Sequence, residues 1–232
     1  MRRSLDEIDA RRLLTGGPIT LVTSGYRGRH NIMPVAYAMT ASIVPPLIAI
    51  AVNPARYSYD IIHKTEEFAL NIPSRALLHH VQYLGSISGV DFDKIELTKL
   101  PTTQARRVDT VLLEGCVGWI ECGLKEEYEV GDHRLLIGQV VAAAADDEAF
   151  NERWLLDDED AKPLHYLGAN FYSTLSGVLE ARIPQRAEDY DRRLQEAVDE
   201  TLELSRDAEE RREEEAGEQE EFRRREGFDR PL

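Results

Sequence analysis

The chain has 232 residues, of which 42% are hydrophobic, and this is enough to form one domain with a core and argues against wholesale disorder. Its formal net charge of −15 argues against electrostatic binding to nucleic acid or to anionic membranes. No run of about 18 apolar residues is present to span a bilayer, and we expect no secretory signal. Two cysteines, Cys116 and Cys122, are too few for a disulfide framework or a thiolate metal cluster. We therefore expect a cytoplasmic protein without a metal site.

The negative charge is unevenly distributed along the chain. Residues 184–232 contain 18 acidic residues against 10 arginines, a net charge of −8. Apolar residues recur there at near-helical spacing from about Ala187, and later become rare. We therefore predict a domain over residues 1–183 and an acidic, helical C-terminal tail over residues 184–232 that is partly disordered or extended. A solvated charged segment is the simpler interpretation of this tail, and binding of a partner is the alternative.

The body is predicted to begin with a short helix. Ser4 and Glu7 have the spacing of a capping box, and Gly16–Gly17 would end the helix. The following segments are short and rich in Val, Ile, Ala and Thr, which favours β-strands. The predicted strands are Ile19–Ser24, Val35–Val44, Leu47–Asn53, Phe68–Ile72, Val111–Leu124 and Arg134–Ala145.

Turns and helices separate these strands. Turns are expected between Gly25 and Gly28, at Pro45–Pro46 and near Gly131, and helices over Ser58–Lys64 and Ser74–Leu84. This order lacks the regular alternation of strand and helix that is typical of a doubly wound parallel sheet. The spacing of the strands instead predicts a mainly β fold with a closed antiparallel barrel and peripheral helices.

Common catalytic motifs are absent from the sequence. We find no GxGxxG after the first strand, no P-loop, no HExxH and no GxSxG. His79 and His80 are adjacent on a predicted helix, so their side chains diverge and are poorly placed to share a metal. The sequence therefore predicts no catalytic side-chain set of its own and no metal ligands.

Four segments resemble those of one known family. Residues 31–74 contain, in order, N-x-M, a small-residue strand, Pro-Pro, a second strand, Arg-x-Ser and E-F-x-L-N. The other three segments are SGVDFDK at 88–94, GDHRLLIGQV at 131–140 and PLHYLGANFY at 163–172. Together they resemble the flavin reductase-like, FMN-binding split-barrel family, and the match covers nearly the whole body.

The resemblance implies a fold and an assembly. It is closest to the flavoredoxin-like branch, because of Asn31, Tyr37 and the Gly-Asp-His sequence at 131–133. The implied fold is a Greek-key split β-barrel of the FMN-binding type, with the acidic C-terminal helix as an addition that the family pattern does not explain. A homodimer is also implied, because a split barrel commonly completes its flavin site across two subunits.

Two segments have the chemistry that FMN requires. Arg56 and Ser58 lie at the start of a predicted helix, where free N–H groups, a guanidinium and a hydroxyl suit a phosphate. An ordinary Ser cap with Arg in solvent is the alternative, and only the resemblance favours the phosphate site. The second segment is the strand Ala38, Met39, Thr40, Ala41 and Ser42, whose small side chains would let backbone N–H groups approach a flat ring.

The remaining candidate residues come from the resemblance. It implies that Asn31 and Asn71 lie near the cofactor and Asn53 beside the phosphate loop. Tyr37 would flank the flavin ring, although a tyrosine is as readily a core residue.

Three more candidates come from the same resemblance. Lys94 and His133 match family positions that approach the flavin, where a cation stabilises the anionic reduced ring. His133 could instead bind the phosphate, and the alternatives are a surface lysine and a turn histidine. Phe171 could cover the ring from its own subunit or from the partner.

The resemblance predicts an FMN-binding oxidoreductase that uses NADH or NADPH as co-substrate. In this hypothesis hydride passes to flavin N5, and electrons continue to a small-molecule or protein acceptor. Two alternatives remain at this point. One is a flavoredoxin-like electron carrier that does not use nicotinamide directly, and the other is an oxidoreductase for one dedicated substrate or a homologue that has lost its flavin.

Overall fold

The computed structural model describes residues 6–180 together with Glu196 and Asp199, which are helical. Residues up to Val178 belong to one compact unit, and Leu179 begins a second one. The predicted acidic tail, apart from those two residues, and the predicted capping residue Ser4 lie outside the described part of the chain. The domain boundary at residue 183 and the helical tail therefore stay predictions.

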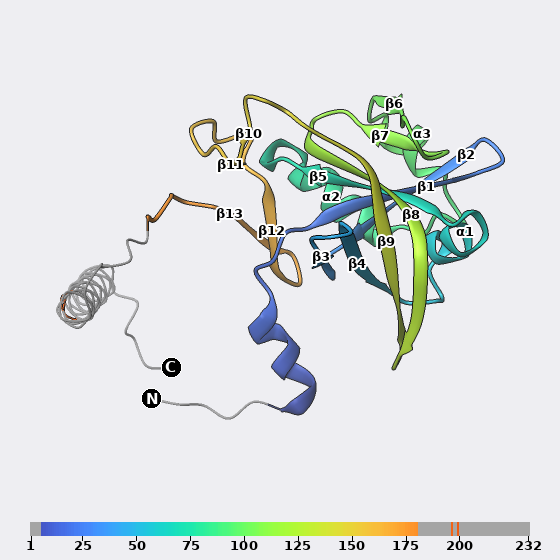
Figure 1. Ribbon diagram of the computed structural model, residues 1–232, viewed down its shortest axis with the longest axis horizontal. Coiled ribbons are helices and arrows are strands. Elements are labelled where there is room, and N and C mark those ends of the chain that lie inside the picture. The colour runs from blue at the N-terminus through green and yellow to red at the C-terminus, as the bar shows by residue number, and fades with distance from the viewer. Residues whose placement is uncertain (1–5, 181–195, 197–198, 200–232) are drawn as a thin grey trace, which may run out of the picture. The chain divides into compact units, whose positions relative to one another are not determined.

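The first unit is mainly β, as predicted, with a few short helices around the strands (Figure 1). The strands are β1 (Thr20–Tyr26), β2 (Arg29–Val35), β3 (Ala38–Ser42), β4 (Leu47–Val52), β5 (Glu67–Pro73), β6 (Thr102–Gln104), β7 (Val111–Leu113), β8 (Cys116–Val130), β9 (His133–Ala145), β10 (Phe150–Asn151), β11 (Arg153–Trp154), β12 (Leu164–Gly168) and β13 (Phe171–Thr174). The helices are the 3₁₀ helices η1 (Glu7–Leu14) and η2 (Arg75–Leu77) and the α-helices α1 (Tyr57–Thr65), α2 (Leu78–Ser86) and α3 (Lys94–Thr98).

Seven strands form one antiparallel sheet in the order β2-β1-β5-β8-β9-β4-β3. The two edge strands, β2 and β3, are consecutive in the chain and are joined only by Ala36–Tyr37. Two linking residues hold the ends of these strands within about 11 Å, so the sheet must curl round until its edges meet at one corner. No ladder joins β2 to β3 in the described sheet, so the barrel is split rather than closed by hydrogen bonds.

The predicted strand Val35–Val44 is wrong at both ends, because Val35 is the last residue of β2 and only Ala38–Ser42 form a strand of their own within this range. β2 pairs with β1 and β3 pairs with β4, so the chain changes neighbours at Ala36–Tyr37. β2 itself was not predicted, since its Pro34 is unusual in a strand interior and is tolerated here at an edge. The run Val111–Leu124 is likewise two strands, interrupted by Gly115 at a φ of 79°.

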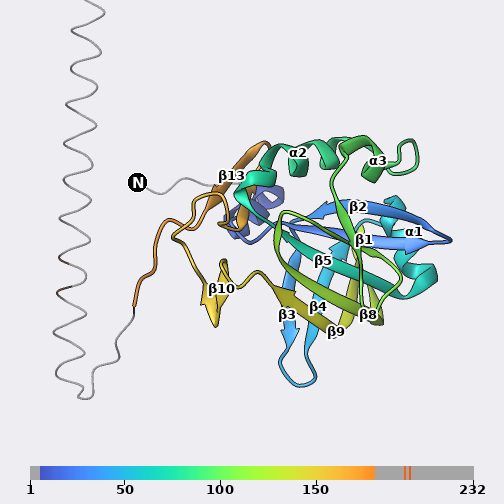
Figure 2. The same ribbon diagram turned by 90° about the horizontal axis from the view of Figure 1, so that it is seen from above.

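The alternating side chains of the strands form two cores. Val22, Phe68, Leu70 and Leu136 belong to a cluster on one face, which α1 covers with Ile62. The neighbouring residues Leu21 and Ile32 point the other way and pack with Val81 and Leu84 of α2. Figure 2 shows α2 and α3 beside β2, on the opposite side of the picture from β3. Among the described residues, no helix is long and apolar enough to cross a membrane.

Local turn chemistry fixes the two hairpins that matter for the site. Arg27 and Gly28, with φ values of 53° and 76°, form the two-residue loop between β1 and β2 that was expected there. Gly131, at a φ of 59°, occupies the first loop position between β8 and β9, where hairpin loops favour glycine. This second turn makes His133 the first residue of β9.

Candidate functional site

Three adjoining pockets form a groove beside the β2–β3 corner of the first unit. The largest, of about 590 Å³, lies between Asn53 and Tyr172 and is called the central pocket here. A pocket of about 300 Å³ around Arg56 and Lys94, the cation pocket, adjoins it through Met33.

The third pocket lies on the other side of the central one. It has a volume of about 560 Å³ and is formed by η1 and the β12–β13 hairpin around Gly17 and Phe171. We call this third pocket the arm pocket. Tyr37 and Tyr166 line both the arm pocket and the central pocket. The three volumes together form a continuous depression of the size in which cofactors and substrates bind.

The cation pocket is built around the N-terminus of α1. The first N–H groups of an α-helix have no intrahelical acceptor and attract anions. Arg56 occupies the N-cap position in an extended conformation without a side-chain cap bond, and Ser58 is the second helical residue rather than the predicted cap. The Ser58 hydroxyl instead accepts a hydrogen bond from Asn31 Nδ2 at 2.7 Å.

Lys94 contributes a second cation to this pocket. Its side chain is 5% exposed, and its Nζ donates to the backbone oxygen of Leu84 at 2.8 Å. Burial and the nearby Arg56 lower the pKa of Lys94 to about 8. No acidic residue lines the pocket, and in the described part of the chain neither Lys94 nor Arg56 has a carboxylate partner. Two unpaired cations in so acidic a protein mark an anion site.

Gly89 allows the loop after α2 to close over this pocket. A Cβ atom at position 89 would lie 2.1 Å from Asn31 Oδ1 and 2.8 Å from the Tyr57 ring, distances that side chains cannot adopt. Only glycine therefore lets the backbone come this near to the start of α1. This contact gives the SGV part of the 88–94 segment a physical reason.

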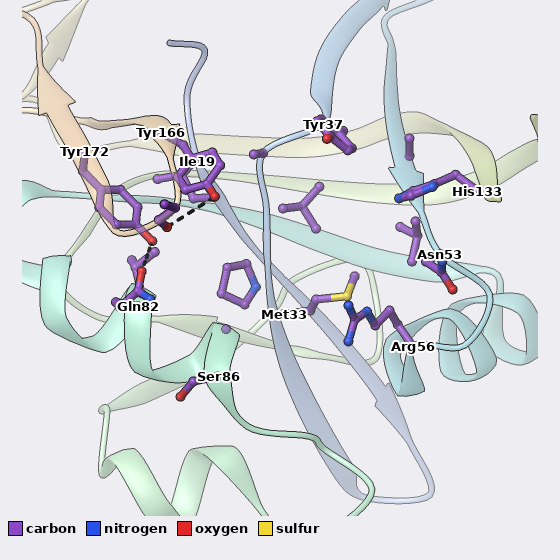
Figure 3. Close-up of a pocket in the computed structure, with 18 of the residues that line it drawn as sticks. Ile19, Met33, Tyr37, Asn53, Arg56, Gln82, Ser86, His133, Tyr166 and Tyr172 are labelled. Atoms are coloured by element: carbon purple, nitrogen blue, oxygen red, sulfur yellow. Dashed lines mark hydrogen bonds between the residues drawn. The ribbon is translucent and has the colours of Figure 1, made fainter. Parts of the chain in front are cut away.

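The central pocket has two walls of different chemistry. Figure 3 shows Asn53, Arg56 and His133 on one side and Tyr166, Tyr172 and Gln82 on the other, with Met33 between them.

On the second wall, the Tyr172 hydroxyl donates to Gln82 Oε1 at 2.8 Å. Gln82 Nε2 in turn donates to Asn170 Oδ1 at 3.0 Å. This chain of bonds fixes the orientation of the polar wall. The first wall has the guanidinium of Arg56 and the imidazole of His133, and the Asp132 carboxylate bonded to His133 also lines the pocket.

His133 is held at the mouth of the central pocket by its neighbours. Its Nδ1 lies 2.8 Å from Asp132 Oδ1, and this hydrogen bond lowers the pKa of Asp132. Its ring meets Tyr37 edge-on with centroids 5.9 Å apart. Tyr37 and His133 therefore share one end of the pocket, as two residues from separate strand ends brought together by the fold.

A polar cluster connects α1 to the β8–β9 hairpin, and we call it the Glu127 clamp. Glu127 on β8 accepts a hydrogen bond from the Tyr59 hydroxyl at 2.6 Å, and its other oxygen lies 3.0 Å from His63 Nδ1. Arg134, next to His133 on β9, lies 3.7 Å from the same carboxylate. Burial raises the pKa of Glu127, but the bonds from Tyr59 and His63 outweigh it and the net pKa is lowered. The clamp sets the distance between the α1 N-terminus and His133.

The fold thus brings most of the predicted site residues into the groove. Asn31, Arg56, Ser58 and Lys94 line the cation pocket, and Asn53, Tyr37, Arg56 and His133 line the central pocket. Phe171 lies in the arm pocket, beside Tyr37.

The remaining predicted residues lie elsewhere. Asn71 is fully buried in the core, where Nδ2 donates to Leu21 O and Thr23 Oγ1 and Oδ1 accepts from Leu113 N. An amide with all these bonds made inside the core supports the sheet and does not reach the groove. The segment Ala38, Met39, Thr40, Ala41 and Ser42 forms the edge strand β3, which is half-buried to exposed and lines none of the three pockets.

Several groove residues were not predicted from the sequence. Met33, Gln82, Ser86 and Tyr172 reach the central pocket from β2, α2 and β13. Tyr166 falls within the 163–172 segment, which was recognised as a segment but not assigned to the pocket. Gln82 and Ser86 lie on an ordinary amphipathic helix and have no sequence signal for this role.

Known proteins are similar to this chain in sequence and in fold. The family model described as "Flavin reductase like domain" matches residues 11–174. The uncharacterized protein YddH of Escherichia coli (strain K12) is 36% identical over 175 residues, which cover 71% of this chain and 90% of that protein.

Solved structures agree with the family match. Flavoredoxin of Desulfovibrio vulgaris (Miyazaki F) aligns with a TM-score of 0.69 and 28% identity over 80% of this chain and 99% of that one. An FMN-binding domain of a flavin reductases-like enzyme from Shewanella baltica OS155 aligns with a TM-score of 0.66 and 25% identity over 78% and 97%. The family match spans most of the chain and includes the pockets around Arg56, Lys94 and His133, and the chain belongs to the flavin reductase-like family.

Proposed function

We propose that this protein binds FMN in the groove and acts as an NAD(P)H-dependent flavin reductase. The observation that carries the proposal is the cation pocket, in which Arg56, Lys94 and the free N–H groups of α1 face a space without any acidic residue. A phosphate dianion is the ligand that such a pocket suits. The relatives named above include an FMN-binding domain and a flavoredoxin, which supports FMN as the source of that phosphate.

The residues of the cation pocket have separate tasks in this proposal. The α1 N-terminus and the Ser58 hydroxyl, oriented by Asn31, hydrogen-bond the phosphate. The Arg56 guanidinium lines both the cation and the central pocket, so it stands between the phosphate and the ring. Lys94 provides a buried positive charge that stabilises negative charge on the cofactor.

The central pocket would receive the flat part of the cofactor. Bound FMN supplies the redox chemistry, because its ring accepts hydride from a nicotinamide. The protein then has to orient the ring and exclude water. Tyr37 and Met33 offer apolar cover, and Asn53, Gln82 and His133 offer polar groups for the ring edges. Because the cofactor supplies the chemistry and the protein only positions it, the absence of a catalytic motif from the sequence agrees with this proposal.

A flavoredoxin-like electron carrier is the second candidate function. The similarity to flavoredoxin at 28% identity over 80% of the chain is the observation that favours it. Such a carrier would hold FMN in the same groove and exchange electrons with another protein, without direct use of nicotinamide. In either case the final acceptor is a small molecule or a protein.

We also propose that the active form is a homodimer. The β3 edge and the turn after it expose Met39, Ile43 and Val44, and apolar residues exposed side by side favour association. A second copy placed against this edge would lie beside the β2–β3 corner, where the groove opens.

Reduction of the bound flavin distinguishes the candidate functions. The protein is loaded with FMN, freed of excess cofactor and oxygen, and titrated with NADPH and with NADH while the flavin absorbance near ~450 nm is followed. Bleaching by either nucleotide is expected for the reductase. Bleaching by dithionite but by neither nucleotide would favour the carrier, and failure to bind FMN at all would contradict both.

A further inference from the structure

The arm pocket has no ligand in the function proposed so far. FMN accounts for the cation and central pockets, but a further volume of about 560 Å³ adjoins them. Its connection to the central pocket runs past Tyr37 and Tyr166, which line both. A ligand in the arm pocket could therefore extend to the flavin ring.

The floor of the arm pocket is bare backbone. Gly16 N donates to Tyr166 O at 2.7 Å and Tyr166 N donates to Gly17 O at 3.1 Å. These bonds fix the segment after η1 to β12. A Cβ atom at Gly17 or at Gly168 would meet no atom within 4 Å. The absence of side chains at these positions leaves a flat open surface of the kind on which a planar ring can lie.

Exposed aromatic rings border this floor. Phe171 is 71% exposed and Tyr37 is 49% exposed, although both lie in a concave part of the surface. Nucleobases stack on such rings whatever their identity, since every base offers a π-face. The pocket therefore has the flat apolar surfaces that an adenine requires.

One arginine of the arm pocket has no counter-charge. Arg12 pairs with Asp9 at 3.2 Å, whereas Arg11 has no ion pair within the described residues. No acidic residue lines the pocket. A free guanidinium binds phosphates well, because its N–H groups match the geometry of the phosphate oxygens.

We propose that the arm pocket binds the adenosine diphosphate half of the nicotinamide dinucleotide, with Arg11 on its phosphates and Phe171 against its base. This assignment rests on the proposed function, because it requires a dinucleotide donor whose nicotinamide reaches the flavin in the central pocket. It adds the location of the donor and makes Arg11 a determinant of donor affinity.

The test uses ADP-ribose, which has the adenosine diphosphate half of both donors and lacks nicotinamide. Its dissociation constant is measured by calorimetry on the full-length, FMN-loaded, oxidised protein. Arg11→Glu reverses the charge, and Gly17→Leu fills the floor at a position with open space and no left-handed φ. Each substitution is expected to lower the affinity for ADP-ribose about tenfold or more and to leave the affinity for FMN unchanged.

Arg29→Glu is the matched control, because Arg29 is exposed at the β1–β2 turn, far from η1 in both views (Figures 1 and 2). It makes the same charge change and should alter ADP-ribose affinity by less than about twofold. In reduction assays, Arg11→Glu should raise the KM for the nucleotide and leave kcat at saturation unchanged.

Three results would overturn the assignment. If wild-type protein is reduced by a nucleotide but both variants bind ADP-ribose like wild type, only the donor subsite is wrong. If the flavin is bound but no nucleotide reduces it, the proposed reductase function fails and the donor assignment fails with it. A change in oligomeric mass without a change in ADP-ribose affinity would show that the pocket is instead covered by a second copy, and would also overturn it.

Discussion

The ammonium of Lys94 is buried without an anion, and this has consequences for the pH dependence of stability and binding. Its pKa in the folded protein is about 8, below the ordinary 10.5, because burial and Arg56 disfavour the charged form. Between these two values the unfolded chain binds more protons than the folded protein, so stability rises with pH across that window. Below about pH 8 the buried charge destabilises the fold unless an anion binds beside it.

FMN affinity should therefore decrease as Lys94 loses its proton. Bound phosphate or reduced flavin favours the charged form, so the free protein must take up a proton to bind at pH 9 but not at pH 7. The dissociation constant of FMN, measured by quenching of flavin fluorescence, should rise about tenfold between pH 7 and pH 9. The Lys94→Gln variant should bind FMN more weakly than wild type at pH 7, and its dissociation constant should not change between pH 7 and pH 9. A flat profile in the wild type would contradict this role.

Asn71 illustrates a residue whose importance is structural. Its amide makes two bonds to β1 and one to β7 while being 0% exposed. Asn71→Ala leaves the backbone groups of Leu21 and Leu113 without these partners, and should lower the free energy of unfolding by about 3 kcal/mol. Urea denaturation without FMN measures this loss. FMN affinity of the folded variant should stay within about twofold, and a large selective loss of FMN would place Asn71 in the site after all.

At the scale of elements, the Glu127 clamp couples α1 to the β8–β9 hairpin. Glu127→Ala removes the bonds to Tyr59 and His63 and leaves α1 and His133 free to separate. We expect FMN to bind about fivefold more weakly, because Arg56 and His133 no longer hold their separation.

Glu129→Ala is the matched control for this prediction. It makes the same change in charge on the same strand and removes only the exposed pair with Arg134. Calorimetric titration of both variants with FMN compares them directly. Equal effects of the two substitutions would show that net charge, rather than the clamp, determines the affinity.

The elements that the sequence predicts well are those with local signals. The bounds of α1, β4, β5 and β9 agree with the predicted segments to within one or two residues, because apolar periodicity and Pro or Gly breakers define them. The bend between β2 and β3 has no such signal, since Val35–Val44 contains neither Gly nor Pro. Its position depends on which strands the two halves pair with, and that is decided by the whole sheet.

The candidate site likewise contains residues that a local sequence pattern indicates and residues that only the whole fold brings together. Arg56 and Ser58 could be recognised as a helix start, but their choice as a phosphate site required the resemblance. Lys94 reaches the same pocket only through the packing of α2 and α3, which no local pattern specifies. The resemblance alone placed Asn71 near the cofactor, and its bonding partners in the fold, Leu21 and Leu113, are 50 and 42 residues away in the sequence, where no local pattern indicates them.

At the scale of the molecule, the β3 edge is expected to form the dimer contact. Ile43 and Val44 are 84% and 88% exposed in the turn that follows this unpaired edge. Light scattering should give a mass of twice 26.3 kDa for the wild type. The double substitution Ile43→Asp with Val44→Asp should give a monomer with weakened FMN binding.

The control for the dimer is Tyr26→Asp at the end of β1, because Tyr26 is exposed and the β1–β2 turn lies away from β3 in both views (Figures 1 and 2). This variant should remain a dimer with unchanged FMN affinity. A monomer that binds FMN as tightly as the wild type would contradict a site shared between two copies.

The proposed function depends on a phosphate bound in the cation pocket at the start of α1. FMN and riboflavin differ only in this phosphate, so calorimetric titration of wild type and Arg56→Ala with each compound shows whether the pocket binds it. Wild type should bind FMN at least about a hundredfold more tightly than riboflavin, and Arg56→Ala should remove most of this difference. Equal affinities of the wild type for the two compounds, or no binding of either, would contradict it.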